Sequence, residues 1–300
     1  NQEFTSGSAP SDYTFGGILG TQEINTRASI YRRGARVSFS GTNTNYSWRS
    51  MGTYASGMNT NGWAFVISAS RRWAQEGFFE GSDYSANSLF ASVEKKINSK
   101  HSLNFTSIFA QNRRGKSSPN SEEVNNLKGF QYNSYWGYQN GRKRNSRDKD
   151  IEEPLNMLTH YWKISDNTNL NTSVSYQVGH IGNSRLDYQT ANSPDPTYYR
   201  NLPSYFLNQP SSYVPGLDGN GNPILTNPNA DLARANFLAD GQIDWNAMYS
   251  ANTTPIYDSL GNEIGRAPAK AKYALYEDRT DDKLWAANSI INTKLSDNIF

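Results

Sequence analysis

The feature that most constrains the fold is the stretch Trp63–Trp73, in which two kinds of side chain alternate. Successive side chains of a β-strand point to opposite faces. One face therefore carries Trp63, Phe65, Ile67 and Ala69, and the other carries Ala64, Val66, Ser68 and Ser70. With a tryptophan at either end, the first face is apolar over about 20 Å. Such a strand is typical of a sheet that meets lipid on one side and a polar interior on the other.

Further strands are predicted on both sides of this one. They are Arg36–Gly41, Trp48–Ser56, Ser88–Ile97, Leu103–Asn112, Leu155–Ile164, Leu170–His180 and Leu284–Leu295. In chain order, alternation is cleanest in the third, fourth and seventh strands and less regular in the fifth and eighth. The first, second and sixth are assigned mainly because they keep the strand number consistent with the connections.

The connections between these strands alternate between short and long. The short ones, at 57–62, 98–102 and 165–169, are rich in the Asn, Gly, Ser and Asp that tight turns need. The long ones lie at 74–87, 113–154 and 181–283. Outer-membrane barrels have short periplasmic turns and long extracellular loops. We therefore expect an all-β, transmembrane antiparallel β-barrel in the outer membrane, with a periplasmic N-terminus and extracellular long loops.

Composition argues against two other classes. No run of about 18 apolar residues occurs, which excludes transmembrane helices. A net charge of +2 and an aromatic content of 13% argue against disorder. The chain has no cysteine, so it forms no disulfide.

The long connection 181–283 is too long to lack structure of its own. Turn sequences at Asp218–Pro223 and Asp258–Asn262 are flanked by short apolar pairs, which predicts two small hairpins. A helical turn is predicted over Asp231–Leu238.

A family pattern is carried by short segments between about Thr14 and Tyr205. These are Tyr31–Ser40 (YRRGARVSFS), Met51–Gly57 (MGTYASG), Asn61–Phe65 (NGWAF), Ser70–Trp73 (SRRW), Val93–Ile97 (VEKKI), Tyr135–Gly141 (YWGYQNG) and Tyr198–Tyr205 (YYRNLPSY). Together they resemble TonB-dependent receptors of the Bacteroidetes outer-membrane type.

The resemblance implies a globular plug inside a barrel of about 22 strands. It assigns residues 1–33 to the C-terminal end of the plug domain and 34–300 to about the first eight strands. The chain is then expected to be a fragment that lacks most of the plug. Phe300, after the turn Ser296–Asn298, is read as the start of a further strand. The alternative is a complete eight-stranded barrel, since eight is an allowed even number.

The function implied by the resemblance is transport of a scarce or large nutrient, such as a siderophore, glycan or peptide. A TonB-type energy-coupling protein would drive it through the missing plug region. The alternative is a non-transporting barrel that acts as a scaffold for a surface lipoprotein or another envelope complex. A soluble all-β domain is a third reading. Outer-membrane lipid and lipopolysaccharide are expected partners, and nucleic acid is not.

Two clusters in the predicted extracellular loops are candidate ligand sites, because tyrosine and tryptophan give large contact areas with few rotors to freeze and the arginines add positive charge. The candidates of the first cluster are Arg113, Arg114, Tyr135, Trp136, Tyr138 and Arg142, and those of the second cluster are Tyr198, Tyr199 and Tyr205. The competing interpretation is that these side chains only pack one loop on another. A membrane-interface girdle is predicted at Trp63, Phe65, Trp73, Tyr176 and Trp285.

No catalytic grouping, cofactor motif or metal site is recognised, so an enzyme is not expected. Asp218, Asn220 and Asn222 have the spacing that opens a calcium loop, but Asn229 stands where a glutamate is required, which favours a hairpin turn. His101, His160 and His180 are predicted to lie at separate strand ends.

Overall fold

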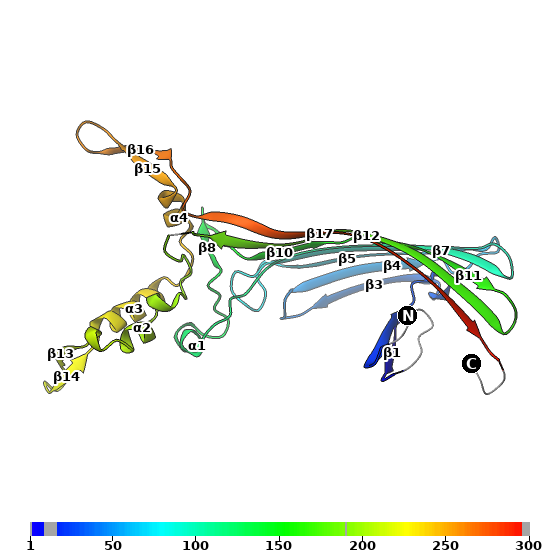
Figure 1. Ribbon diagram of the computed structural model, residues 1–300, viewed down its shortest axis with the longest axis horizontal. Helices are drawn as coiled ribbons and strands as arrows, with labels where there is room; N and C mark the ends of the chain where they lie inside the picture. The colour runs from blue at the N-terminus through cyan, green and yellow to red at the C-terminus, as the bar shows by residue number, and fades with distance from the viewer. Residues whose placement is uncertain (1, 9–16, 190, 296–300) are drawn as a thin grey trace.

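One antiparallel sheet dominates the computed structural model, which describes residues 2–8, 17–189 and 191–295 (Figure 1). Its principal strands are β3 (Gly34–Gly41), β4 (Trp48–Ala55), β5 (Trp63–Ala74), β6 (Tyr84–Lys96), β7 (His101–Gly115), β11 (Leu155–Lys163), β12 (Thr168–Asp187) and β17 (Ala274–Thr293). Each pairs antiparallel with the next in chain order. The prediction of a mostly antiparallel β-fold is confirmed, and every predicted strand is present.

The predicted ends of several strands are wrong. β7 continues to Gly115 instead of ending at Asn112, β12 continues to Asp187 instead of His180, and β17 begins at Ala274 instead of Leu284. The added part of β17 contains Glu277, Asp278 and Arg279 and has no apolar face, so hydrophobic alternation does not reveal it. Backbone pairing with β12 holds it in the sheet, and the loop predicted at 181–283 spans only 188–273.

The predicted loop 113–154 also contains part of the sheet. Its last segment, β10 (Asp148–Glu152), pairs with β7 and β12 in the register that β11 continues. Glu153 and Pro154 interrupt the ladder between β10 and β11, because proline has no N–H to donate. β10 and β11 thus act as one long strand with a break.

The three long connections lie at one end of the sheet, together with the short first connection, and the remaining short connections lie at the opposite end (Figure 1). We call the end with the connections 42–47, 75–83, 116–147 and 188–273 the loop end. The opposite end, with 56–62, 97–100 and 164–167, is the turn end. The predicted alternation of connections is confirmed.

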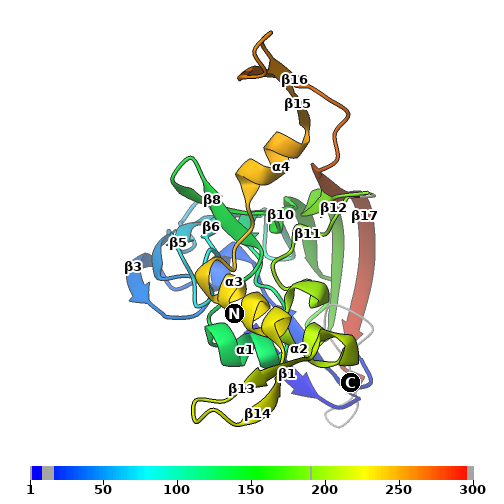
Figure 2. The ribbon, with the colours of Figure 1, turned by 90° about the vertical axis from the view of Figure 1, so that its left-hand side faces the viewer.

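Two of the long connections fold together at the loop end into what we call the loop cap (Figure 2). From the first come α1 (Glu122–Lys128), β8 (Trp136–Gln139) and β9 (Arg142–Asn145); from the second come η2 (Tyr199–Asn201), α2 (Pro203–Leu207), η3 (Pro210–Ser212), β13 (Val214–Leu217), β14 (Pro223–Thr226), α3 (Pro228–Ala239), α4 (Trp245–Ala251), β15 (Thr253–Tyr257) and β16 (Glu263–Pro268). Both predicted hairpins are confirmed, and the predicted helical turn lies within α3. None of the described helices is long and apolar enough to cross a membrane.

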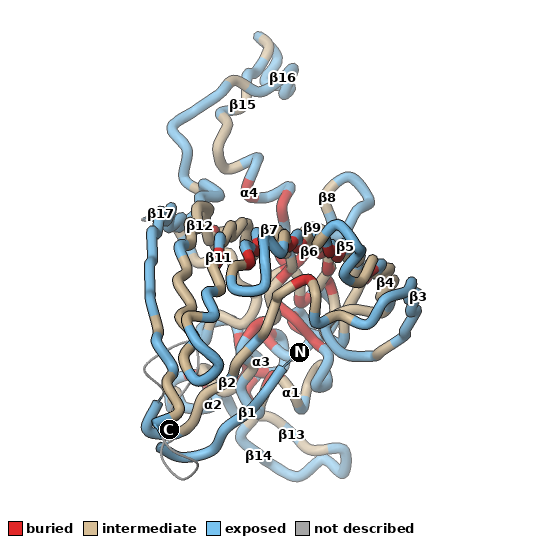
Figure 3. The backbone as a smooth tube through the Cα atoms, turned by 90° about the vertical axis from the view of Figure 1, so that its right-hand side faces the viewer, coloured by how far each residue is buried: buried red, intermediate tan, exposed pale blue. Residues whose placement is uncertain are grey.

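The N-terminal segment lies beneath the concave face of the sheet (Figure 3). It comprises the hairpin β1 (Gln2–Ser6) and β2 (Gly20–Ile24), followed by η1 (Ala28–Ile30). Ala28 is fully buried against Ala55, Ala64 and Val66 of the sheet. Residues 9–16 of the predicted plug segment, the predicted turn Ser296–Asn298 and Phe300 lie outside the described residues.

Candidate functional site

The two faces of the sheet differ in chemistry as the alternation predicts. The convex face carries exposed apolar side chains in neighbouring strands, among them Phe39, Tyr54, Trp63, Phe65, Ile67, Leu89, Val93, Leu103, Phe105, Leu158, Val174 and Trp285. The concave face carries Ser92, Glu94, Asn104, Thr106 and Thr159, all buried. A contiguous exposed apolar face is typical of a surface that meets a membrane or a partner.

The predicted girdle residues all lie on the convex face. Trp63 is at the turn end of β5 and Trp73 at its loop end, where Trp73 lies close to Phe39. Phe65 packs beside Tyr54, and the Tyr176 ring lies 4.5 Å from the ring of Trp285 on the neighbouring strand. The contacts of Phe65 with Tyr54 and of Tyr176 with Trp285 join neighbouring strands on one face, as the pairing register requires.

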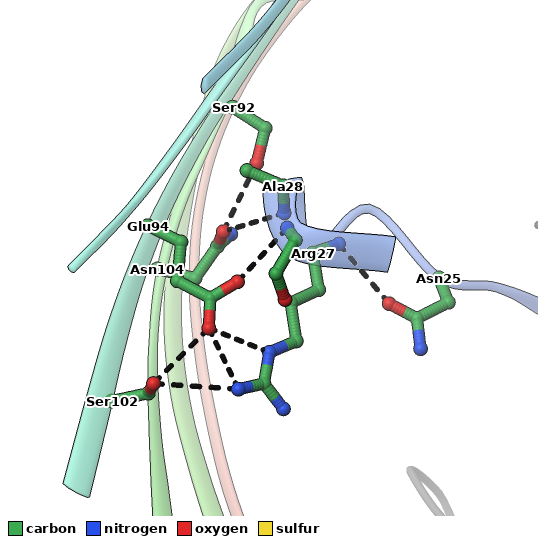
Figure 4. A network of polar contacts seen from close by, with 8 residues as sticks. Asn25, Arg27, Ala28, Ser92, Glu94, Ser102 and Asn104 are labelled. Carbon is green, nitrogen blue, oxygen red and sulfur yellow. Dashed lines mark hydrogen bonds and ion pairs between the residues drawn. The ribbon is translucent and has the colours of Figure 1, made fainter. Parts of the chain in front are cut away.

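The concave face holds the N-terminal segment through a buried carboxylate (Figure 4). Glu94 of β6 is fully buried, and its Oε1 accepts hydrogen bonds from Arg27 Nε at 2.9 Å and Nη2 at 2.7 Å. The hydroxyl of Ser102 donates to the same oxygen, while Oε2 accepts from the backbone N–H of Ser29. The Arg27 guanidinium also lies 4.2 Å from the ring centroid of Tyr161.

A second buried acceptor extends this network along β7. Asn104 Oδ1 accepts from the backbone N–H of Ala28 at 3.0 Å and from the Ser92 hydroxyl at 3.1 Å. Its amide donates to Thr106, whose hydroxyl is 3.2 Å from that of Thr26. The polar groups on both sides of this contact can bond to water instead, while the apolar part of the interface is the packing of Ala28 and Tyr31 on the sheet.

Sequence reasoning missed this contact. Nothing in the sequence pairs Glu94 with Arg27, which is 67 residues away. An unpaired acid on the inner face of a predicted strand is the one signal available, because a buried carboxylate needs a cationic partner.

Buried and part-buried polar contacts join the two connections of the loop cap. Glu123 of α1 accepts at its two carboxylate oxygens from the backbone N–H and the hydroxyl of Ser204, at 2.8 and 2.7 Å. The buried hydroxyl of Tyr132 donates to the carbonyl of Gly241. Burial raises the pKa of Tyr132, so this hydroxyl keeps its proton.

The two arginines predicted as ligand contacts lie at the loop end of β7, on opposite faces. Arg113 Nη2 is 2.7 Å from Asp148 Oδ2, and this ion pair raises the pKa of Arg113. Arg114 borders a cavity of about 310 Å³ together with Phe79, Tyr84 and Lys116. The structure therefore assigns Arg113 an internal partner and leaves Arg114 beside open space.

The aromatic candidates of the first cluster belong to the β8–β9 hairpin and its approach. Trp136 is buried, with its ring edge-on to Tyr138 and Lys143 Nζ 4.5 Å from its centroid. Gly81 lies against this ring at φ 63°, where a Cβ would approach Trp136 Cγ to 2.1 Å. Trp136 thus packs the cap together and cannot meet a ligand directly.

The remaining candidates of the first cluster are more open. Tyr138 and Arg142 are exposed, while Tyr135 is half-buried beneath Arg147, whose guanidinium lies 5.2 Å from the ring centroid. These three face solvent at the loop end and remain candidates for ligand contact.

Tyr198, Tyr199 and Tyr205 form a chain of edge-on ring contacts, with centroids 4.8 and 5.6 Å apart. Arg200 donates from Nε to the Tyr199 hydroxyl, which lowers the pKa of that phenol. Within the described part of the chain, no ring of this cluster contacts a ring of the first. The two segments nevertheless meet beside these rings, where Thr197 Oγ1 lies 3.5 Å from Ser134 Oγ.

The prediction that the histidines lie at separate strand ends is wrong for two of them. His101 Nδ1 is 3.0 Å from His160 Nε2, and the ring planes differ by 5°. The register of β7 and β11 makes the two side chains diagonal neighbours on the convex face at the turn end. The described residues contain no group of three or more potential metal-ligating acids and histidines.

Comparison with known proteins gave no match among family models, curated proteins or solved structures.

Proposed function

We propose that this chain belongs to an outer-membrane TonB-dependent transporter that takes up a scarce or large nutrient such as a siderophore, glycan or peptide. In this proposal the sheet is part of a plugged β-barrel of about 22 strands, with its turn end in the periplasm and the loop cap outside the cell. The N-terminal segment up to residue 33 is the end of the plug.

The observation that carries the proposal is the polar attachment of the N-terminal segment to the concave face. A plug must stay in place at rest and move when it is pulled. This requires an interface whose hydrogen bonds can be exchanged for hydrogen bonds to water. The contacts of Arg27, Ser29 and Ala28 with Glu94 and Asn104 are of that kind. The exposed apolar convex face supports a lipid environment for the same strands.

The proposal is tested by locating the protein and measuring import. We expect the full chain to enter the outer-membrane fraction and to migrate differently on gels before and after heating. A strain lacking it should fail to grow on one class among ferric siderophores, glycans and peptides, and loss of the energy-coupling protein should reproduce that defect. A protein that stays in the aqueous phase without detergent refutes the membrane assignment.

A scaffold for a surface lipoprotein is the second candidate, favoured by the two projecting hairpins of the loop cap. β13–β14 exposes Leu217 and Leu225, and β15–β16 exposes Leu260 and Ile264. Deleting both hairpins should abolish the association with a surface partner in this alternative while leaving nutrient import intact.

A further inference from the structure

A cavity of about 860 Å³ lies between the N-terminal segment and the concave face of β3 and β4, and its charge is of one sign. Arg32, Arg33, Arg36 and Arg49 line it, together with Tyr31, Met51 and Thr53. No aspartate or glutamate is among its lining residues. A concave site lined by one sign of charge concentrates ligands of the opposite sign.

A fifth arginine extends this cluster. Arg72 on β5 is the direct cross-strand partner of Arg49 on β4, so both side chains project from the same face of the sheet. Like charges in that relationship repel each other and destabilise the strand pair. The pairing is therefore unfavourable unless an anion lies between or beside the two guanidinium groups.

The guanidinium groups of this pair are poorly satisfied within the described residues. The Nε atoms of Arg49 and Arg72 are both buried without a hydrogen-bond partner. Arg49 Nη2 donates only to the thioether sulfur of Met51, which is a weak acceptor. Arg72 lies over the Tyr46 ring, 5.6 Å from its centroid, and neither arginine forms an ion pair with a described acid.

Elsewhere on the concave face, beneath β6, a buried acid and an arginine form an ion pair. Glu94 is neutralised by Arg27, so the one buried carboxylate of that region is already used. The arginine cluster beside β3, β4 and β5 is left without a counter-charge from the described chain. A guanidinium presents a rigid fork of donors that matches carboxylate and phosphate oxygens in pairs.

We propose that this cavity binds a ligand bearing carboxylate or phosphate groups, held by Arg36 and Arg49 with Arg72 beside them. This inference rests on the proposed function and specifies an anionic cargo that contacts the inner face on its passage. The occupant we commit to is a small anion from outside, and an acidic segment of the protein itself is an alternative outcome of the test.

The test measures binding of citrate, as a tricarboxylate probe, to the purified full chain in non-ionic detergent at low salt. Inorganic pyrophosphate replaces citrate in a second series, and sorbitol serves as a neutral polyol. We expect saturable binding of either anion, weakening as salt is added, and none of sorbitol. Replacing two guanidinium donors in R49Q/R72Q should weaken citrate binding at least about tenfold.

Arg71 supplies a matched control, since it is adjacent to Arg72 in the chain but lies on the convex face, where it donates to Asn87. R71Q should bind citrate within about twofold of the unaltered protein. R49K/R72K keeps both charges and removes only the planar forks, so it should fold and bind citrate at an intermediate strength. This variant keeps the test informative if R49Q/R72Q does not fold.

Three results overturn the inference: no saturable citrate or pyrophosphate binding, undiminished binding by R49Q/R72Q and R49K/R72K, or equal weakening in R71Q. An acidic segment of the protein that fills the cavity would give the first result together with a loss of thermal stability in R49Q/R72Q. A protein that enters the membrane and imports a nutrient but binds neither anion refutes the anion site alone. A protein that never enters the membrane refutes the proposed function.

Discussion

One guanidinium and one carboxylate oxygen join the N-terminal segment to the sheet: Arg27 donates from Nε and from Nη2 to Oε1 of Glu94. The second oxygen, Oε2, stays available for the backbone N–H of Ser29. A single buried side chain thus fixes both a side chain and the backbone of the segment. Truncating one partner of such a pair costs more than the pair contributes, because the other charge is left without compensation.

Glu94→Ala should therefore release the N-terminal segment. Arg27 keeps 31% of its side chain exposed, which limits the cost to about 3 kcal/mol or less. We expect trypsin to cleave after Arg32 and Arg33 at least about tenfold faster than in the unaltered protein. The matched control is Asp166→Asn, which removes an exposed ion pair with Lys163 at the same end of the sheet and should leave these sites unchanged. Equal cleavage rates in the two variants would contradict the anchoring role of Glu94.

The convex face makes a separate prediction. Ile67 is 49% exposed in the middle of β5, so Ile67→Arg should destabilise the protein folded in a bilayer by about 2–4 kcal/mol. Ser70→Arg, on the concave face of the same strand, should cost far less because that face meets water or polar groups. Urea titration of folding into lipid vesicles measures both, and an unaffected equilibrium for Ile67→Arg would exclude a lipid-facing position.

The sequence was sufficient to predict the eight principal strands of the sheet and which way their side chains face, because both follow from a period of two, whereas β10 was assigned to a loop. Trp63, Phe65 and Ile67 therefore lie on the face that the alternation predicts. Strand ends without an apolar face could not be predicted in this way. β17 extends through Glu277–Arg279 by backbone pairing with β12 and by the ion pair of Asp278 with Arg185, and neither leaves a hydrophobic alternation in the sequence.

The candidate sites were harder to predict because they depend on register and long-range packing. The pairing of His101 with His160 requires the register between β7 and β11, which sequence alone leaves open. Tryptophan is a residue type common at binding surfaces, but only the packing of the loop cap shows that Trp136 is buried. The Arg49–Arg72 pair likewise becomes visible only when β4 and β5 are aligned.

The dependence of stability on pH can be derived at Asp83, just before β6. Desolvation raises the pKa of this carboxyl, the nearby charge of Asp148 raises it further, and Arg113 partly opposes both. A raised folded-state pKa favours folding when the acid is protonated and loses that contribution as pH rises through the folded-state value. Asp83→Asn should therefore stabilise the protein at pH 7, and the gain should shrink as pH falls through the raised folded-state pKa and vanish below the ordinary range for aspartate.

The pKa of Asp166 is shifted in the opposite direction to that of Asp83. Its hydrogen bond with Lys163 lowers the pKa, so its contribution is present above the unfolded-state pKa and disappears as pH falls through the folded-state one. Asp166→Asn should thus reduce stability slightly at neutral pH and have no effect in acid. Thermal unfolding of both variants between pH 3 and pH 7, in steps of about one unit, measures the two trends; parallel trends would contradict the burial assigned to Asp83.

A buried hydrogen bond from the hydroxyl of Tyr132 joins the two connections of the loop cap. Tyr132 is 1% exposed and packs edge-on against Phe237, while its hydroxyl donates to the carbonyl of Gly241 in the second connection. Tyr132→Phe keeps the ring but leaves that buried carbonyl unpaired, which should destabilise the cap by about 1–3 kcal/mol. Trypsin cleavage after Arg234 in α3 should accelerate accordingly. Tyr138→Phe is the control, because Tyr138 is 57% exposed in the neighbouring hairpin and its hydroxyl bonds to water in either state. If both variants are cleaved at the rate of the unaltered protein, the two connections are held together by apolar packing alone, and the buried hydrogen bond makes no net contribution to the cap.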